Sequence, residues 1–150
     1  MEYTRSIRVI GGRDEVAALF ADASTWHEWQ PPLLSVEVLE GQPPTTGARS
    51  RLTFRRGRRG TMVMTETVEH GALPEQWNVV YEVPGVHNLC ENRFTPTKAG
   101  ATIIEQRNVF RFTGFMRVVG LLFGRSFPRE TEKSLEAFRS FATERFGAAR

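Results

Sequence analysis

The stretch from Leu33 to Phe112 constrains the fold of this chain more than any other part of its 150 residues. It is a run of segments in which apolar and polar residues alternate, joined by short connections such as QPPTTG, GALPE, PG and TKAG. Alternation with a period of two is typical of half-buried strands, and consecutive strands with short connections pair in antiparallel order. The sequence therefore predicts a meander of six antiparallel strands. They cover residues 33–41, 48–56, 61–70, 76–83, 87–96 and 101–112.

The regions on either side of this meander complete the expected fold. Residues 3–10 alternate and predict a first strand; the stretches RDEVAALFADA and STWHEW predict two short helices, the second ended by Pro31-Pro32. Residues 127–147 carry an apolar stripe at helical spacing and predict a long C-terminal helix. A strongly curved sheet around this helix would bury the stripe and leave a cavity between the two. We expect an α+β fold with a seven-stranded curved antiparallel sheet, as a single domain over residues 1–150.

The composition and the cysteine content limit the cellular compartment in which we expect such a domain. With 40% hydrophobic and 25% charged residues and a formal net charge of +3, the chain has the composition of a globular protein. No apolar run reaches the roughly 18 residues needed to span a bilayer, and the N-terminus lacks the apolar core of a signal peptide. The lone cysteine, Cys90, excludes an internal disulfide and fits a reducing compartment. We therefore expect a cytoplasmic protein without stable membrane insertion.

Several motifs that suggest chemistry at first sight lack residues that the chemistry requires. A zinc hydrolase needs His-Glu-x-x-His on one helix, but His27-Glu28 is followed by WQPP, and Cys90 has no second cysteine, so no metal site is expected. The turn RRGRRG, residues 55–60, contains only arginine and glycine, without the aromatic side chains on which single-stranded nucleic acid stacks. There is no glycine-rich phosphate loop either. We expect no cofactor and no nucleic-acid partner.

Strand alternation places several polar side chains on the face that should line the cavity. Glu66 shares that face with the methionines of its strand, and Gln106 and Asn108 share it with aromatic residues of the last strand. In the strand before it, Phe94 favours Asn92 pointing inward, although a bulge would turn the opposite face to the cavity. A carboxyl group buried among apolar residues has a raised pKa and can act as general acid or base. Two interpretations of Glu66 stay open: a catalytic or ligand-binding group, and a residue that pairs with an arginine or faces water.

The order of these elements resembles a known family. The stretches GRDEVAALFADASTWHEWQPPLLSVEVLEG, GARSRLTF, TETVEHGALPEQW, FTPTKAGATIIEQ and GFMRVVGLLFGRSFPRETEKSLEAFRSFA are together similar to the polyketide cyclase/dehydrase and lipid-transport group of the START-like (SRPBCC) superfamily. The similarity spans nearly the whole chain and includes no catalytic signature. It implies the helix-grip fold and an apolar ligand held in the cavity. In this fold the short helix with Trp26 and Trp29 would close one side of the cavity.

On this basis we expect a protein that binds or transports a small hydrophobic molecule such as a lipid, a polyketide or an isoprenoid. One alternative is a polyketide cyclase or dehydratase with Glu66 as candidate acid-base residue, and another is a protein with a vestigial cavity whose surface binds a partner. A homodimer stays open, because the apolar segment Gly114–Gly124 fits a gate, a dimer patch or, most simply, part of the helix seam. The expected ligand-binding residues are Trp29, Phe54, Met62, Met64, Glu66, Trp77, Tyr81, Asn92, Gln106, Asn108, Phe110, Leu135 and Phe138.

Overall fold

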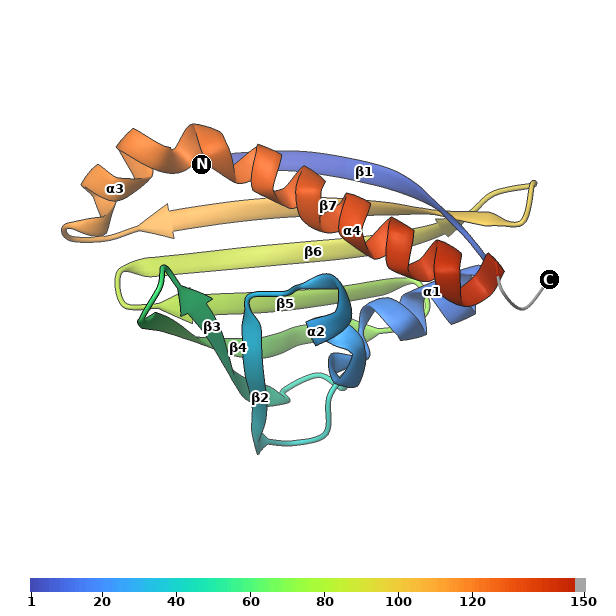
Figure 1. Ribbon diagram of the computed structural model, residues 1–150, viewed down its shortest axis with the longest axis horizontal. Helices are drawn as coiled ribbons and strands as arrows, with labels where there is room; N and C mark the ends of the chain where they lie inside the picture. The colour runs from blue at the N-terminus through green and yellow to red at the C-terminus, as the bar shows by residue number, and fades with distance from the viewer. Residues whose placement is uncertain (148–150) are drawn as a thin grey trace.

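The computed structural model describes residues 1–147, which form a strongly curved antiparallel sheet with a long helix across its concave face (Figure 1). The seven strands have the order β1-β7-β6-β5-β4-β3-β2, so β1 pairs with β7 and the other neighbours are consecutive in sequence. This is the α+β helix-grip arrangement that the sequence predicts. The strands are β1 (Glu2–Ile10), β2 (Leu33–Glu40), β3 (Arg49–Arg56), β4 (Gly60–Ala72), β5 (Gln76–Val83), β6 (Val86–Pro96) and β7 (Ala101–Phe112).

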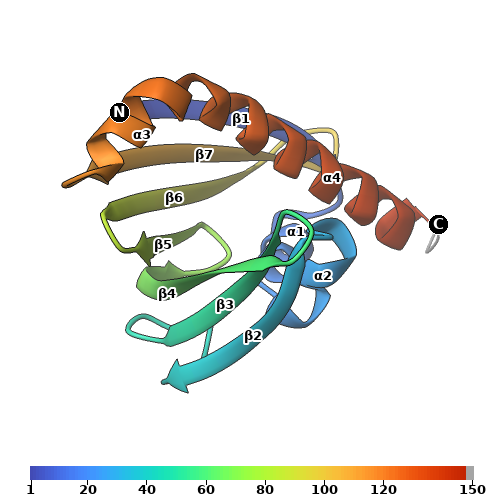
Figure 2. The same ribbon diagram turned by 60° about the vertical axis from the view of Figure 1, so that its left-hand side comes forward.

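The helices occupy two regions of the chain. The first region joins β1 to β2 and contains α1 (Arg13–Phe20), the 3-10 turn η1 (Ala23–Thr25) and α2 (Trp26–Trp29). The second follows β7 and contains α3 (Met116–Phe123), the 3-10 turn η2 (Gly124–Ser126) and α4 (Phe127–Gly147). The sheet curls from β1, beneath α4, round to β2, with α1 and α2 on its inner side (Figure 2). Helix α4 packs against β1, α1 and α2.

Alternation along each strand determines which side chains enter the interior. In β3, Ser50 and Leu52 are buried, whereas Arg49 and Arg51 are exposed. Directly opposite residues of antiparallel neighbours point to the same side of a sheet, so the pairing register joins inward side chains into rows. One such row crosses the concave face through Ser50, Glu66, Tyr81, Asn88 and Phe110.

In β6 the structure resolves the question of which face points inward. Asn88, Cys90, Asn92 and Phe94 are buried, and the side chains between them lie on the other face. The position of Phe94 therefore predicts the correct face, and no bulge interrupts the pairing of β6 with β7.

Helix α4 holds the fold together through its apolar stripe. Leu135, Phe138 and Ala142 are spaced by three and four residues, so they share one helix face, and all three are buried. The Phe138 ring meets Phe20 of α1 and Trp29 of α2 edge-on, with centroid distances of 5.0 and 5.1 Å. Such edge-to-face contacts add to the free energy of burial and fix the position of both short helices against α4.

Two elements differ from the expectation. The segment after Gly114 forms a separate helix, α3, in which no residue is buried, instead of joining the seam of the long helix. Strand β4 extends to Ala72, beyond the expected end, and contains a register shift between Val68 and His70. Within the part of the chain that the structure describes, no helix is both long enough and apolar enough to cross a membrane.

Candidate functional site

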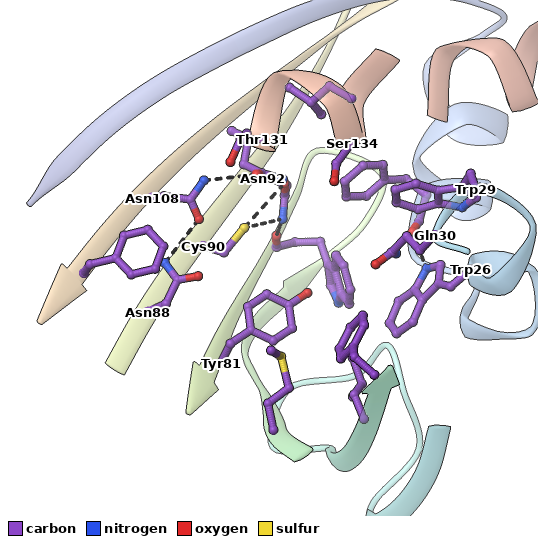
Figure 3. Close-up of a pocket in the computed structure, with 18 of the residues that line it drawn as sticks. Trp26, Trp29, Gln30, Tyr81, Asn88, Cys90, Asn92, Asn108, Thr131 and Ser134 are labelled. Carbon is purple, nitrogen blue, oxygen red and sulfur yellow. Dashed lines mark hydrogen bonds between the residues drawn. The ribbon is translucent and has the colours of Figure 1, made fainter. Parts of the chain in front are cut away.

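A cavity of about 240 Å³ lies between the concave face of the sheet, α4 and the α1–α2 region (Figure 3). Strands β1 and β3 to β7 contribute side chains from below, and α4 contributes Thr131, Ser134 and Leu135 from above. The side chains around the cavity are those of Tyr3, Phe20, Trp26, Trp29, Gln30, Leu52, Phe54, Met64, Trp77, Tyr81, Asn88, Cys90, Asn92, Gln106, Asn108, Phe110, Thr131, Ser134 and Leu135.

One end of the cavity is bordered by aromatic rings. The Trp26 and Trp77 rings have centroids 6.0 Å apart, and the Phe20 ring packs on Trp29 at 5.6 Å. The indole N–H of Trp26 donates to the carbonyl of Phe20 at 2.9 Å, which joins α2 to the end of α1. The Nε1 atoms of Trp29 and Trp77 are buried without a hydrogen-bond partner among residues 1–147. All three tryptophans of the sequence thus border the cavity and offer it flat apolar surfaces.

A chain of side-chain amides runs over β6 and β7 along the opposite side (Figure 3). The Nδ2 of Asn88 donates to Oδ1 of Asn108 at 3.2 Å, and the Nδ2 of Asn108 donates to Oε1 of Gln106 at 3.0 Å. The Nε2 of Gln106 donates to Oδ1 of Asn92 at 2.8 Å. The Nδ2 of Asn92 ends the chain by donating to the backbone carbonyl of Trp77 at 3.0 Å. The amides satisfy one another, so this polar wall is compatible with burial.

Tyr81 and Ser134 present hydroxyl groups to the space between these two sides. Tyr81 reaches in from β5 and Ser134 points down from α4, while the Gln30 side chain approaches from the end of α2 (Figure 3). The Tyr3 hydroxyl has a different role, because it lies 2.7 Å from Oγ1 of Thr131 and joins β1 to α4. A ligand in the cavity can therefore reach the Tyr81 and Ser134 hydroxyls without disturbing the contact between β1 and α4.

Glu66 lies directly opposite Tyr81 in the pairing of β4 with β5 and is 2% exposed. Its Oε2 atom has no hydrogen-bond partner within the described residues. Burial raises the pKa of Glu66 to about 7, and the Tyr81 side chain lowers it in part. Burial, together with the Glu66 carboxylate, raises the pKa of Tyr81 well above its ordinary value. The pair places a carboxyl that titrates near neutral pH beside a cavity-facing hydroxyl, which is an arrangement that can transfer a proton.

Most of the expected ligand-binding residues border the cavity, but Met62, Glu66 and Phe138 do not. Met62 is at the outer end of β4, near the hairpin turn; Glu66 is buried beside Tyr81, and Phe138 is fully buried against Phe20 and Trp29. Glu66 does not face water, and it pairs with no arginine among residues 1–147. The periodicity of a strand or helix shows which face a side chain is on, but not how far it lies from the cavity. Periodicity therefore places these three residues in the expected binding set although they do not border the cavity. The expected residues that do border the cavity are Trp29, Phe54, Met64, Trp77, Tyr81, Asn92, Gln106, Asn108, Phe110 and Leu135.

Other residues border the cavity although they are absent from the expected binding set. Thr131 lies one turn before Leu135 and Ser134 lies one turn before Phe138, so extending the helical stripe toward the start of α4 would have found both. Phe20 and Leu52 carry no such signal, because an apolar residue that lines a cavity has the same pattern as one in the core. Trp26, expected to close the cavity, does border it.

The residues that suggested metal or nucleophile chemistry lie apart from one another. His27 and His70 are exposed, and within residues 1–147 no group of three His, Cys, Asp or Glu side chains is placed to hold a metal ion. Glu28 forms an ion pair with Arg145 at 3.8 Å, which connects α2 to α4. Burial raises the pKa of the Cys90 thiol to about 12, so this side chain is a neutral thiol at physiological pH.

Solved structures with the same fold have low sequence identity to this chain. Ara h 8.0201 is 10% identical with a TM-score of 0.74, over 96% of this chain and 98% of that chain. The di-domain ARO/CYC StfQ from the steffimycin biosynthetic pathway is 14% identical with a TM-score of 0.77, over 97% of this chain and 51% of that chain. A Thalictrum norcoclaurine synthase is 13% identical with a TM-score of 0.72, over 97% and 95% of the two chains. At these identities the likeness shows the fold alone.

The fold and the cavity define the class of this protein as a helix-grip domain with an internal space between its sheet and its C-terminal helix. The family model described as polyketide cyclase / dehydrase and lipid transport matches residues 1–142. The chain belongs to this family, whose members bind hydrophobic ligands or act as cyclases. No curated protein sequence matches the chain.

Proposed function

We propose that this protein binds and carries a small hydrophobic molecule in the cavity beneath α4. The observation that carries the proposal is a largely apolar cavity, bordered at one end by aromatic rings, into which the hydroxyls of Tyr81 and Ser134 project. A ligand with an apolar body and one polar group would pack its body against the apolar side chains and place its polar group within reach of a hydroxyl. Membership of a family with hydrophobic ligands supports this function.

The size of the cavity limits the ligand. A volume of about 240 Å³ is larger than the roughly 150 Å³ of an engineered cavity that binds benzene. A ligand of about two fused rings, or a branched chain of similar bulk, therefore fits. Its flat faces would lie against Trp26, Trp77 and Phe54, with Met64 adapting to its outline. Its polar group would lie near Tyr81.

The test compares naphthalene with 2-naphthol, which differ by one hydroxyl, by isothermal titration calorimetry. We expect both to bind and 2-naphthol to bind about fivefold to tenfold tighter, the contribution of one hydrogen bond. Tyr81→Phe should remove that difference. Tyr3→Phe is the matched control, because its hydroxyl faces Thr131 rather than the centre of the cavity. Absence of saturable binding by either compound, or a preference that survives Tyr81→Phe, would contradict the proposal.

A cyclase or dehydratase is a second candidate function, favoured by the Glu66–Tyr81 pair. A carboxyl with a pKa of about 7 exchanges protons readily at neutral pH, and Tyr81 would pass the proton between Glu66 and the ligand. Exchange of the α-hydrogens of 1-tetralone, a two-ring ketone, for deuterium can be followed by NMR. Turnover predicts exchange faster than in buffer, lost in both Glu66→Gln and Tyr81→Phe while 1-tetralone still binds to Glu66→Gln. Bound 1-tetralone without faster exchange argues for the carrier function.

A further inference from the structure

Helix α3 and the residue before it expose a row of large apolar side chains, the α3 patch, formed by Phe115, Val118, Leu121, Leu122 and Phe123. Leu121 is 84% exposed and Phe115 77% exposed, and the other three are between 49% and 68% exposed. A surface helix of a globular protein normally carries polar residues on its outer side. In α3 the outer side carries apolar residues and a single arginine. An apolar surface of this kind marks an interaction site.

The α3 patch is held outward by close packing of the inner side of the helix. Gly120 lies against the Phe112 ring, where a Cβ atom would approach to 2.8 Å. Gly85, in the turn between β5 and β6, has a φ of 82° and leaves room for the Met116 side chain. The amide of Thr113 also donates to the carbonyl of Gly85 at 2.9 Å. These contacts fix α3 at the end of the sheet where β7 finishes, so the exposure of the patch is a property of the fold (Figure 1).

The charged side chains in the sequence segment that contains the α3 patch are all positive. Residues 112–129 contain Arg117, Arg125 and Arg129 and no aspartate or glutamate. Among residues 1–147, none of these three arginines takes part in an ion pair. The basic residues that do pair with nearby acids lie elsewhere and are Arg5, Arg49, Arg51, Arg107, Lys133, Arg139 and Arg145. The patch therefore combines an apolar centre with cationic side chains that have no acidic partner in this part of the chain.

We propose that the α3 patch docks this protein on the surface of an anionic lipid bilayer. The apolar side chains would enter the boundary between headgroups and acyl chains, and the arginines would contact lipid phosphates. Charge argues against a second copy of the chain as the occupant. A symmetric dimer through this patch would bring the arginines of both copies together with no acid in residues 112–129 to neutralise them.

Docking in this way would bring one wall of the cavity close to the bilayer. Phe110 borders the cavity and contacts Phe127 at the start of α4, with ring centroids 5.0 Å apart. Phe127 in turn contacts Phe112 at 6.2 Å, and Phe112 lies beneath Gly120 of α3. A single aromatic cluster thus joins the cavity wall to the inner side of the docking helix. The docking itself does not depend on what the cavity binds.

The test measures co-sedimentation of the full chain with vesicles of phosphatidylcholine alone and of phosphatidylcholine mixed with phosphatidylglycerol. We expect binding to the mixed vesicles that weakens as salt is added, because the salt screens the arginines. The double variant Arg117→Gln with Arg125→Gln should bind the mixed vesicles about 25-fold more weakly, because each arginine contributes about fivefold. Leu121→Ser should weaken it about tenfold, since a buried leucine contributes at least that much. These positions are exposed, so the fold should persist, as circular dichroism would verify.

Matched controls make the same changes elsewhere on the surface. Arg58→Gln with Arg59→Gln, in the β3–β4 turn, changes the net charge equally, and Leu34→Ser removes an exposed leucine from β2. Neither control should alter vesicle binding. The proposal is overturned by absence of binding to the mixed vesicles, or by equal losses in the turn control. It is also overturned if light scattering shows a dimer that Leu121→Ser dissociates while vesicle binding is unchanged.

Discussion

Replacing Glu66 with Gln should stabilise the folded protein at alkaline pH and leave its stability unchanged at acid pH. Burial raises the pKa of this carboxyl from 4.5 to about 7, so the folded chain binds the proton more tightly than the unfolded chain. A change of this size corresponds to about 3 kcal/mol in the free energy of unfolding. That contribution is complete below pH 4.5 and is lost as the pH rises to about 7. Above this range the wild type buries a carboxylate whose Oε2 has no partner in the described residues, whereas the amide stays neutral.

Urea unfolding, followed by tryptophan fluorescence at about pH 4.5 and about pH 8.5, measures this effect. We expect Glu66→Gln to raise the free energy of unfolding by about 2 to 3 kcal/mol at the higher pH and by less than about 0.5 kcal/mol at the lower pH. Glu69→Gln is the control, because Glu69 lies on the same strand and is exposed. It should show little change at either pH. Equal effects of Glu66→Gln at both pH values, or destabilisation at high pH, would refute the reasoning.

Three further predictions concern buried side chains. Cys90 should react with a thiol reagent at about pH 8 only on unfolding, because burial raises its pKa to about 12; absorbance of the released thiolate with and without urea measures this. Asn92→Ala should lower the free energy of unfolding by about 3 kcal/mol, because Asn92 is buried and its loss leaves the Gln106 Nε2 and the Trp77 carbonyl without this partner. Gln106→Ala should cost only about 1 kcal/mol, because Gln106 is partly exposed and water can take its place beside Asn92 and Asn108; a larger loss for Gln106→Ala than for Asn92→Ala would contradict this reasoning. Phe138→Ala should cost about 4 kcal/mol in the same denaturation assay, and a loss below about 1 kcal/mol would disprove its central place in the core.

The fold follows from two periodicities that the sequence displays openly. Alternation from Leu33 to Phe112 predicts the strands, and the stripe that contains Leu135 predicts the helix across them. In β6 the choice between two faces is decided by one large apolar residue, Phe94, because alternation allows no third option. These predictions succeed because the period of a strand or a helix is determined by residues close to one another in the sequence.

The site is less predictable, because it depends on register and depth. Alternation places Asn92, Gln106 and Asn108 on one face, but the amide chain also requires Asn92 to lie opposite Gln106, which is set by the pairing of β6 with β7.

Helix α3 is difficult to predict for another reason, because its sequence suggests more burial than the structure shows. An apolar run such as FMRVVGLLF favours burial, yet the structure leaves its outer side in solvent. Sequence apolarity alone does not distinguish a core helix from one that meets a partner.

The amide chain has a fixed direction, because it ends at a main-chain oxygen. The Trp77 carbonyl can only accept, so Asn92 turns its Nδ2 toward it and its Oδ1 toward Gln106. Each amide then orients the next, until Asn88 gives its Nδ2 to Asn108 and retains its Oδ1. A ligand group that approaches Asn88 would meet an acceptor, so we expect this position of the cavity to favour a hydroxyl or an amine. In the described chain no charged side chain borders the cavity, so the local preference expected at Asn88 would be set remotely, through three neighbouring amides, by one backbone oxygen.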